Sequence, residues 1–121
     1  RAFDACRTSV ETLIAEIQAG VSAGDVARRA GAAMRAIEPD LLWHGYYGGS
    51  TGLSFSPTYS DGGAVEITER SDEPLVAGMT FHASTSLRDV GVFGVTCSET
   101  VAVTETGCEV LTSVPRDLHV A

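Results

Sequence analysis

The fold of this chain is decided by two segments, Gly78-Met79-Thr80-Phe81-His82 and Ser98-Glu99-Thr100-Val101-Ala102-Val103-Thr104-Glu105-Thr106-Gly107. Both are rich in β-branched or aromatic residues, which favour strands. Glu105-Thr106-Gly107 has the composition of a tight hairpin connection between antiparallel strands. We therefore expect strands near residues 79–84, 92–103 and 108–112, with the last two joined by this hairpin.

The first third of the chain predicts two helices. Residues 2–19 carry apolar side chains at spacings of three and four, and Gly20 is expected to end this helix. Ser22 begins the second helix, with Asp25 three residues on as its capping-box partner, and Pro39 ends it. The expected core residues are Phe3, Val10, Leu13, Ile17, Val26, Met34, Ile37, Phe81, Val101 and Val103.

After residue 40 the composition changes to Thr, Val, Ser and Gly, which favours short strands and turns. Residues 41–49 are aromatic and glycine-rich, a further strand is expected near residues 52–56, and 61–63 predict a turn. Two helices followed by an antiparallel sheet indicate the α+β class, with both helices packed on one face of a curved sheet. Neither a dinucleotide-binding glycine motif nor a P-loop occurs, so nothing supports a nucleotide site.

Composition limits the partners and the compartment. The 121 residues suit one domain, and the net charge of −8 disfavours nucleic acid and anionic membranes, which reward clustered basic residues. The three cysteines form no C-x-x-C pair, and a hairpin centred near Thr106 places Cys108 opposite about Thr104, away from Cys97. Free thiols are therefore expected, in a reducing, cytoplasmic setting.

Four motifs together resemble the C-terminal half of the pita-bread hydrolases, the family of creatinase, aminopeptidase P, prolidase and methionine aminopeptidase. They are the two opening segments, Pro115-Arg116-Asp117-Leu118, and Gly48, Ser50, Gly52, Leu53, Phe55 and Pro57. The last set and Gly78–His82 are most similar to the ectoine-hydrolase-like branch, which hydrolyses a cyclic amidine. The resemblance implies that residues 1–121 are the second half of a pita-bread domain whose first half, with two Asp ligands, is absent.

The resemblance also implies a two-metal site to which this half normally contributes one His and two Glu. Aligned on Gly52-Leu53, the metal His falls on Gly49, and a following His-Glu landmark falls on Ser56-Pro57. The first metal Glu falls on Ser84 and the last on Glu99, which alone retains a ligand type. Glycine has no donor atom and a hydroxyl is a poor ligand for a dication, so most of the usual divalent-metal site is expected to be lost.

Other polar side chains are candidates for binding or catalysis. Glu99 is interpreted as a metal ligand or a general base, with the alternative that it lies on a solvent-facing strand surface. His82 is expected beside it as a proton-transfer group, or as an ordinary exposed histidine. Tyr46 and Tyr47 line a substrate pocket or cover the core, and Ser84 completes the predicted substrate-binding set. His44 is expected to be an ordinary loop histidine, with the alternative that it replaces the lost metal His through a shift in register, and His119 is expected to have no role.

Two functions are therefore carried forward. The first is part of a C–N bond hydrolase of the Xaa-Pro peptidase/creatinase superfamily, active only in a full-length protein, with Glu99 and His82 in the site. The second is a non-catalytic pita-bread module that binds a peptide or protein in the old cleft. In both, the expected partners are a small molecule or short peptide, together with a second copy of the chain or its own missing half, since an incomplete sheet exposes unpaired edges.

Overall fold

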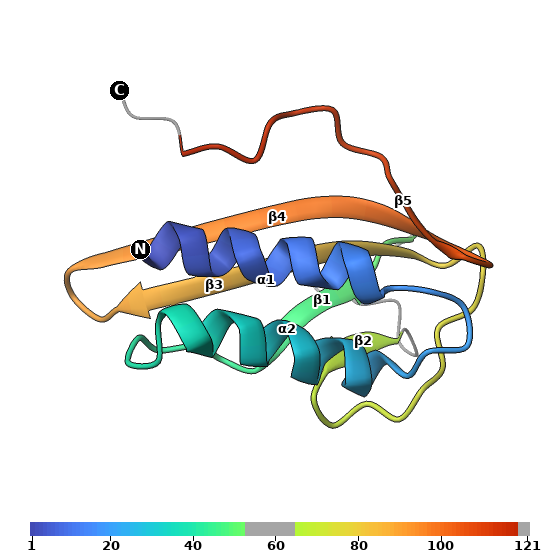
Figure 1. Cartoon of the computed structure of the whole chain (residues 1–121), viewed down its shortest axis with the longest axis horizontal. Coiled ribbons are helices and arrows are strands. Elements are labelled where there is room, and N and C mark those ends of the chain that lie inside the picture. Colours follow the sequence, from blue (N-terminus) through green and yellow to red (C-terminus); the bar gives the residue numbers. More distant parts are fainter. Residues whose placement is uncertain (53–64, 119–121) are drawn as a thin grey trace.

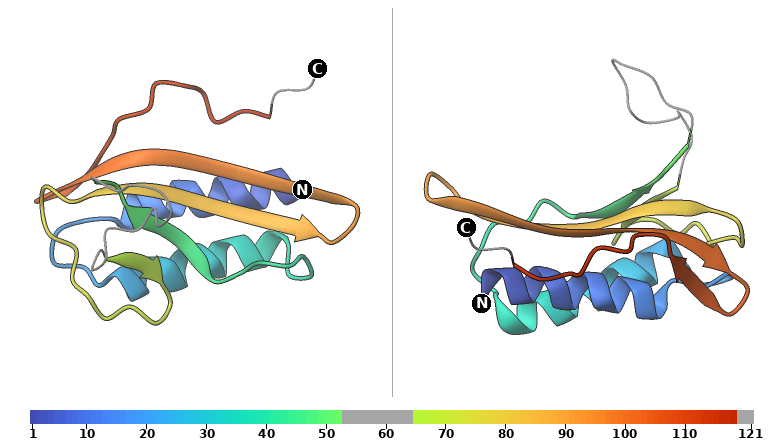
Figure 2. Two further views of the ribbon diagram at one scale, coloured as in Figure 1. Left: turned by 180° about the vertical axis from the view of Figure 1, so that it is seen from behind. Right: turned by 90° about the horizontal axis from the view of Figure 1, so that it is seen from above.

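The computed structural model describes residues 1–52 and 65–118 as two helices and a five-stranded antiparallel sheet. The elements are α1 (Ala2–Glu16), α2 (Ala23–Ile37), β1 (Tyr46–Ser50), β2 (Glu66–Thr68), β3 (Thr80–Asp89), β4 (Phe93–Thr104) and β5 (Gly107–Val110). The strand order is β2-β1-β3-β4-β5, so β2 and β5 form the two edges. Both helices lie on one side of the sheet (Figure 1, Figure 2), which is the predicted α+β architecture.

The first helix is shorter than expected. It ends at Glu16, and Ile17 already has extended dihedral angles, φ −69° and ψ 115°. The prediction that Gly20 ends the helix was therefore wrong. Residues 17–21 instead form a connection in which the Ala19 amide donates to the Thr104 carbonyl and the Gly20 amide to the Leu75 carbonyl. These two bonds fasten the connection to β4 and to the segment between β2 and β3, so residues 17–20 do not continue the helix.

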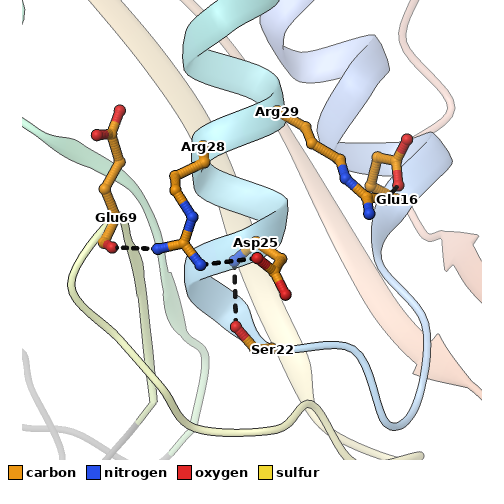
Figure 3. A network of polar contacts seen from close by, with 6 residues as sticks. All are labelled: Glu16, Ser22, Asp25, Arg28, Arg29 and Glu69. Carbon is orange, nitrogen blue, oxygen red and sulfur yellow. Dashed lines mark hydrogen bonds and ion pairs between the residues drawn. The ribbon is translucent and has the colours of Figure 1, made fainter.

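The second helix begins and ends where the sequence indicates. The Ser22 hydroxyl caps it by accepting a hydrogen bond of 3.1 Å from the Asp25 amide (Figure 3). In the same picture Arg28 bridges the Asp25 carboxylate and the Glu69 carbonyl, at 2.7 Å each. The helix thus holds the loop that follows β2. Neither helix of the described part of the chain is long and apolar enough to span a membrane.

The hairpin between β4 and β5 is confirmed, with Thr104 opposite Gly107 across Glu105 and Thr106. Strand β3 runs to Asp89, five residues beyond the prediction, because its alternation of buried side chains continues through Leu87. Strand β5 ends at Val110 rather than near residue 112. Beyond this end, the Thr100 amide of β4 donates its hydrogen bond to the Thr112 side-chain hydroxyl and not to a backbone carbonyl of a longer β5.

The glycine-rich segment 41–49 contains a strand that the composition did not predict. Strand β1 pairs with both β2 and β3, and a bulge lies between Tyr46 and Gly48 in its pairing with β2. Glycine is depleted from strands in general, but a Cβ at Gly48 would lie only 2.6 Å from the His82 carbonyl oxygen, so this close approach requires it. The strand predicted at 52–56 and the turn at 61–63 lie largely outside the described residues.

The core lies between the helices and the sheet. Eight of the ten predicted core residues are buried, and Phe3 and Ile37 pack against the core while remaining partly exposed. Cys6, Cys97 and Cys108 are all free thiols, and Cys108 lies opposite Val103 rather than Thr104. Burial raises the pKa of Cys6 to about 11 and also raises the pKa values of Cys97 and Cys108.

Candidate functional site

The two faces of the sheet differ in chemistry because side chains alternate along each strand. On β3, Phe81, Ala83, Thr85 and Leu87 are buried toward the helices, and the Thr85 hydroxyl donates to the Ser9 hydroxyl of α1 at 2.9 Å. The residues between them, beginning with His82 and Ser84, therefore point to the opposite side. We call that side the open face; within the described residues neither helix covers it (Figure 2).

One row of residues crosses the open face from edge to interior. Glu66 of β2 pairs with Gly49 of β1, Gly49 pairs with His82 of β3, and His82 pairs with Thr100 of β4. Directly opposite residues on one face have Cβ atoms about 4.5–5.5 Å apart. The Glu66 carboxylate and the His82 imidazole thus flank a glycine, and both are exposed.

The Tyr46 side chain occupies the space that a side chain at position 49 would fill. A Cβ built on Gly49 would lie 2.2 Å from the Tyr46 hydroxyl oxygen, and the next nearest atoms also belong to that ring. The phenol therefore occupies the open face between Glu66 and His82. The His44 ring stacks on Tyr46 with centroids 6.5 Å apart and an interplanar angle of 15°. Burial, and next the Glu66 charge, raise the pKa of the Tyr46 hydroxyl.

Hydroxyl groups cover much of the rest of the open face. Ser84 of β3 lies directly opposite Ser98 of β4, and both belong to this face. The next pair, Ser86 and Thr96, shares a hydrogen bond of 2.8 Å. Predicted substrate-binding Ser84 is therefore on the accessible side, among neutral donors and acceptors rather than carboxylates.

The sequence predicted that Glu99 and His82 lie side by side, but the structure places their side chains on opposite faces of the sheet. Glu99 pairs with Ala83 on the face toward the helices, and its side chain is only 2% exposed. One carboxylate oxygen accepts a 2.9 Å bond from the guanidinium of Arg116, and the other is buried with no hydrogen-bond partner among the described residues. A small cavity of about 160 Å³ lies here between β4 and the C-terminal segment, lined by residues including Phe3, Cys97 and Pro115. Glu99 thus holds the C-terminal segment against the sheet.

Tyr47 also belongs to the helix side. It is fully buried, its ring lies 4.6 Å from that of Trp43, and its hydroxyl approaches Gly31 of α2, where a Cβ would be 2.1 Å away. Burial raises its pKa. Of the two alternatives left open for the tyrosines, core cover holds for Tyr47, whereas Tyr46 reaches the open face, so the two do not line one pocket.

The structure therefore brings together Tyr46, His82 and Ser84, and separates them from Glu99 and Tyr47. The sequence analysis missed Glu66, Ser98 and Arg116. Glu66 follows the predicted turn at residues 61–63, where no strand was expected, so no pattern connected it to Gly49 and His82. His119, Leu53, Phe55 and Pro57 lie outside the described residues. Within residues 1–52 and 65–118 no group of three or more His, Cys, Asp or Glu side chains is placed to hold a metal ion.

Comparison with known proteins gives a consistent result. Residues 1–105 match the family model for metallopeptidase family M24. No curated protein matches the chain. Among solved structures, an X-Pro aminopeptidase from Thermotoga maritima is similar at 26% identity with a TM-score of 0.82, over 96% of this chain and 31% of its own.

Two further structures share the fold. Dipeptidase PepE from Mycobacterium ulcerans is 24% identical with a TM-score of 0.83, over 97% of this chain and 30% of its own. The N-terminal domain of FACT complex subunit SPT16 from Cicer arietinum is 18% identical with a TM-score of 0.81, over 94% of this chain and 28% of its own. The sheet and helices thus match half of a pita-bread fold, and the chain spans less than a third of each of these structures.

Proposed function

The chain belongs to metallopeptidase family M24, and from this premise we propose that it forms one half of a pita-bread cleft that binds its ligand without supplying a metal-ligand pair. Residues 1–121 are, in this proposal, the C-terminal half of the domain, and the open face is its share of the cleft. The observation that carries the proposal is the pairing of Ser84 with Ser98 on that face.

The side chains of the open face do not fit a dinuclear metal centre. Two carboxylates that share one metal site must point to the same face. If the family's first metal Glu corresponds to Ser84, its cross-strand partner on that face is Ser98, because Glu99 points to the other side. The last Glu of the family is therefore matched better by Ser98 than by Glu99. Serine hydroxyls are poor ligands for divalent ions.

The expected histidine position gives the same result. It falls on Gly49, and the Tyr46 phenol already fills the space beside this glycine. Of the two predicted functions, the geometry therefore supports the ligand-binding module better than a hydrolase that uses Glu99 as ligand or base. A peptide is the expected ligand, because exposed Ser and Thr hydroxyls can pair with its backbone amides and carbonyls.

The test combines metal and peptide titrations of the purified protein. We expect calorimetry with Mn²⁺ and Co²⁺ to show no site of micromolar affinity. An Xaa-Pro dipeptide should bind and be recovered intact after prolonged incubation. Micromolar binding of either metal, abolished by Ser84→Ala and Ser98→Ala, would overturn the proposal.

A second candidate is a metal-independent C–N hydrolase of the ectoine-hydrolase-like kind. It is favoured by the exposed His82 next to the Tyr46 phenol, which places two groups able to transfer protons on the open face. We expect turnover of ectoine by the full-length protein, if this candidate holds, to survive chelators and to fall on the order of a hundredfold in His82→Gln.

A further inference from the structure

We propose that Tyr46 and Glu66 form a recognition site on the open face for a cationic nitrogen group, an ammonium or amidinium, of the bound ligand. This inference rests on the proposed function and names the chemistry of the ligand. The argument starts from position 49, where the absence of a side chain lets the Tyr46 phenol lie over the sheet.

The first step is the charge. Glu66 is exposed, and among the residues that the structure describes it forms no ion pair, whereas Glu16, Glu38, Glu69 and Glu99 each have an arginine partner. The carboxylate projects beside Gly49 and therefore beside the Tyr46 hydroxyl. The Glu66 charge is, after burial, the second cause of the raised pKa of Tyr46, which agrees with the short distance between the two side chains. An unpaired carboxylate next to a phenol attracts cations and repels anions.

The second step is the aromatic surface. Tyr46 and His44 are stacked within 6.5 Å, so an aromatic surface adjoins the carboxylate. Cations are attracted to tyrosine rings, with a gain of about 0.5–1 kcal/mol at exposed sites. A carboxylate and an aromatic face together recognise a nitrogen cation that donates hydrogen bonds. Glu66 disfavours an anionic group, such as a carboxylate or a phosphate, at this end of the ligand.

The third step is the neighbourhood. His82 closes the row on the side of β3, and hydroxyls of Ser84 and Thr100 follow. These groups can pair with neutral polar atoms of the same ligand but do not compete for its positive charge. The row thus orients a ligand with its cationic end at β1–β2 and its neutral polar part over β3–β4. A peptide N-terminus and a small amidine share this chemistry.

The probe is acetamidinium, with acetamide as its neutral isostere, titrated into the purified protein and followed by NMR or calorimetry. Glu66→Gln should weaken acetamidinium binding at least tenfold, as expected for loss of a charge-assisted hydrogen bond. Tyr46→Leu should weaken it about two- to fivefold, the fold-change that corresponds to one exposed cation–π contact. Gly49→Ala should act in the same direction, because the new methyl group would displace the phenol.

Glu109→Gln is the matched control. Glu109 is an exposed carboxylate on the same face, paired with Ala102, but it lies on β5 at the far edge of the sheet. Its variant should bind acetamidinium within twofold of the wild type. Equal weakening by Glu66→Gln and Glu109→Gln would show general attraction by a negative protein and would overturn the inference. Equal binding of acetamide and acetamidinium, or no binding of either, would overturn it too.

Two further arms separate the sources of the cation and the two proposals. Binding of Ala-Pro that is lost in N-acetyl-Ala-Pro supports a peptide ammonium, and binding of acetamidinium alone supports a small amidine. The calorimetric titration with Mn²⁺ and Co²⁺ tests the proposed function independently of acetamidinium binding. A micromolar metal site overturns the proposed function whatever acetamidinium does, whereas no metal site together with unchanged binding in Glu66→Gln overturns only this inference.

Discussion

Replacement of Arg116 by methionine tests whether Glu99 has a structural role. The Glu99 side chain is 2% exposed and that of Arg116 is 33% exposed, with 2.9 Å between Oε1 and the guanidinium nitrogen. Removing one partner of a fully buried pair costs about 3–5 kcal/mol, because it leaves an uncompensated buried charge. Since water reaches a third of the arginine and screens the pair, we expect a loss of about 1–3 kcal/mol in the free energy of unfolding.

Urea denaturation followed by circular dichroism measures this loss, as a shift of the midpoint at constant slope. The matched control is Asp117→Asn. Asp117 lies on the same C-terminal segment, 71% exposed and 3.8 Å from Arg7, so its loss should change stability by less than about 0.5 kcal/mol. Hydrogen exchange adds a local readout. The Leu111 amide donates to the Thr100 carbonyl at 2.8 Å, and its protection should fall in Arg116→Met if the segment detaches.

The competing interpretation makes Glu99 a catalytic base or a metal ligand. It predicts that Glu99→Gln in the full-length protein lowers the rate on the order of a hundredfold at unchanged stability. The structural role predicts the reverse, a less stable protein whose remaining folded fraction binds its ligand normally. Arg116→Met with the stability of the wild type, combined with a Glu99→Gln protein that is folded but inactive, would refute our reasoning about this pair.

Three further predictions concern packing, pH and assembly. Gly31→Ala should destabilise the protein by about 1–2 kcal/mol in urea, because the new Cβ would lie 2.1 Å from the buried Tyr47 hydroxyl, and the effect should be smaller in a Tyr47→Phe background, where the Glu69 and Arg35 side chains remain near the new Cβ. The buried Cys6, with its pKa raised to about 11, keeps its proton in the folded state. The unfolded state therefore binds fewer protons between about pH 9 and 11, and stability should fall across that range but less so in Cys6→Ala. Sedimentation of the 12.6 kDa protein should show a dimer, or a complex with an added N-terminal half, formed through the edge strands β2 and β5, and a stable monomer would contradict this.

The helices and the central strands could be predicted because their signals are local. The Ser22 cap, the apolar spacing of α1 and the Glu105–Gly107 hairpin each involve residues close in sequence. Strand β1 could not be predicted in this way. Its glycines are unfavourable in an isolated strand. Gly48 is required by the His82 carbonyl of a strand distant in sequence, and Gly49 by the way the Tyr46 ring of the same strand lies over it in the folded sheet. Such tertiary requirements override local propensity.

The place of Glu99 shows what the periodicity of a strand can add to a motif. The motif identified a glutamate near the expected position, but in a strand a difference of one residue is a difference of face. Val95, Cys97, Val101 and Val103 share the parity of Glu99, and an apolar alternation of this length indicates the face toward the core. The neighbouring side chain that points to the open face is therefore Ser98, and the alternation along the strand could have shown this from the sequence. What it did not contain was the partner that makes a buried carboxylate tolerable, since Arg116 lies seventeen residues away in a segment without regular structure. The face of a strand residue should therefore be fixed by its alternating neighbours before a catalytic role is transferred to it from a family motif.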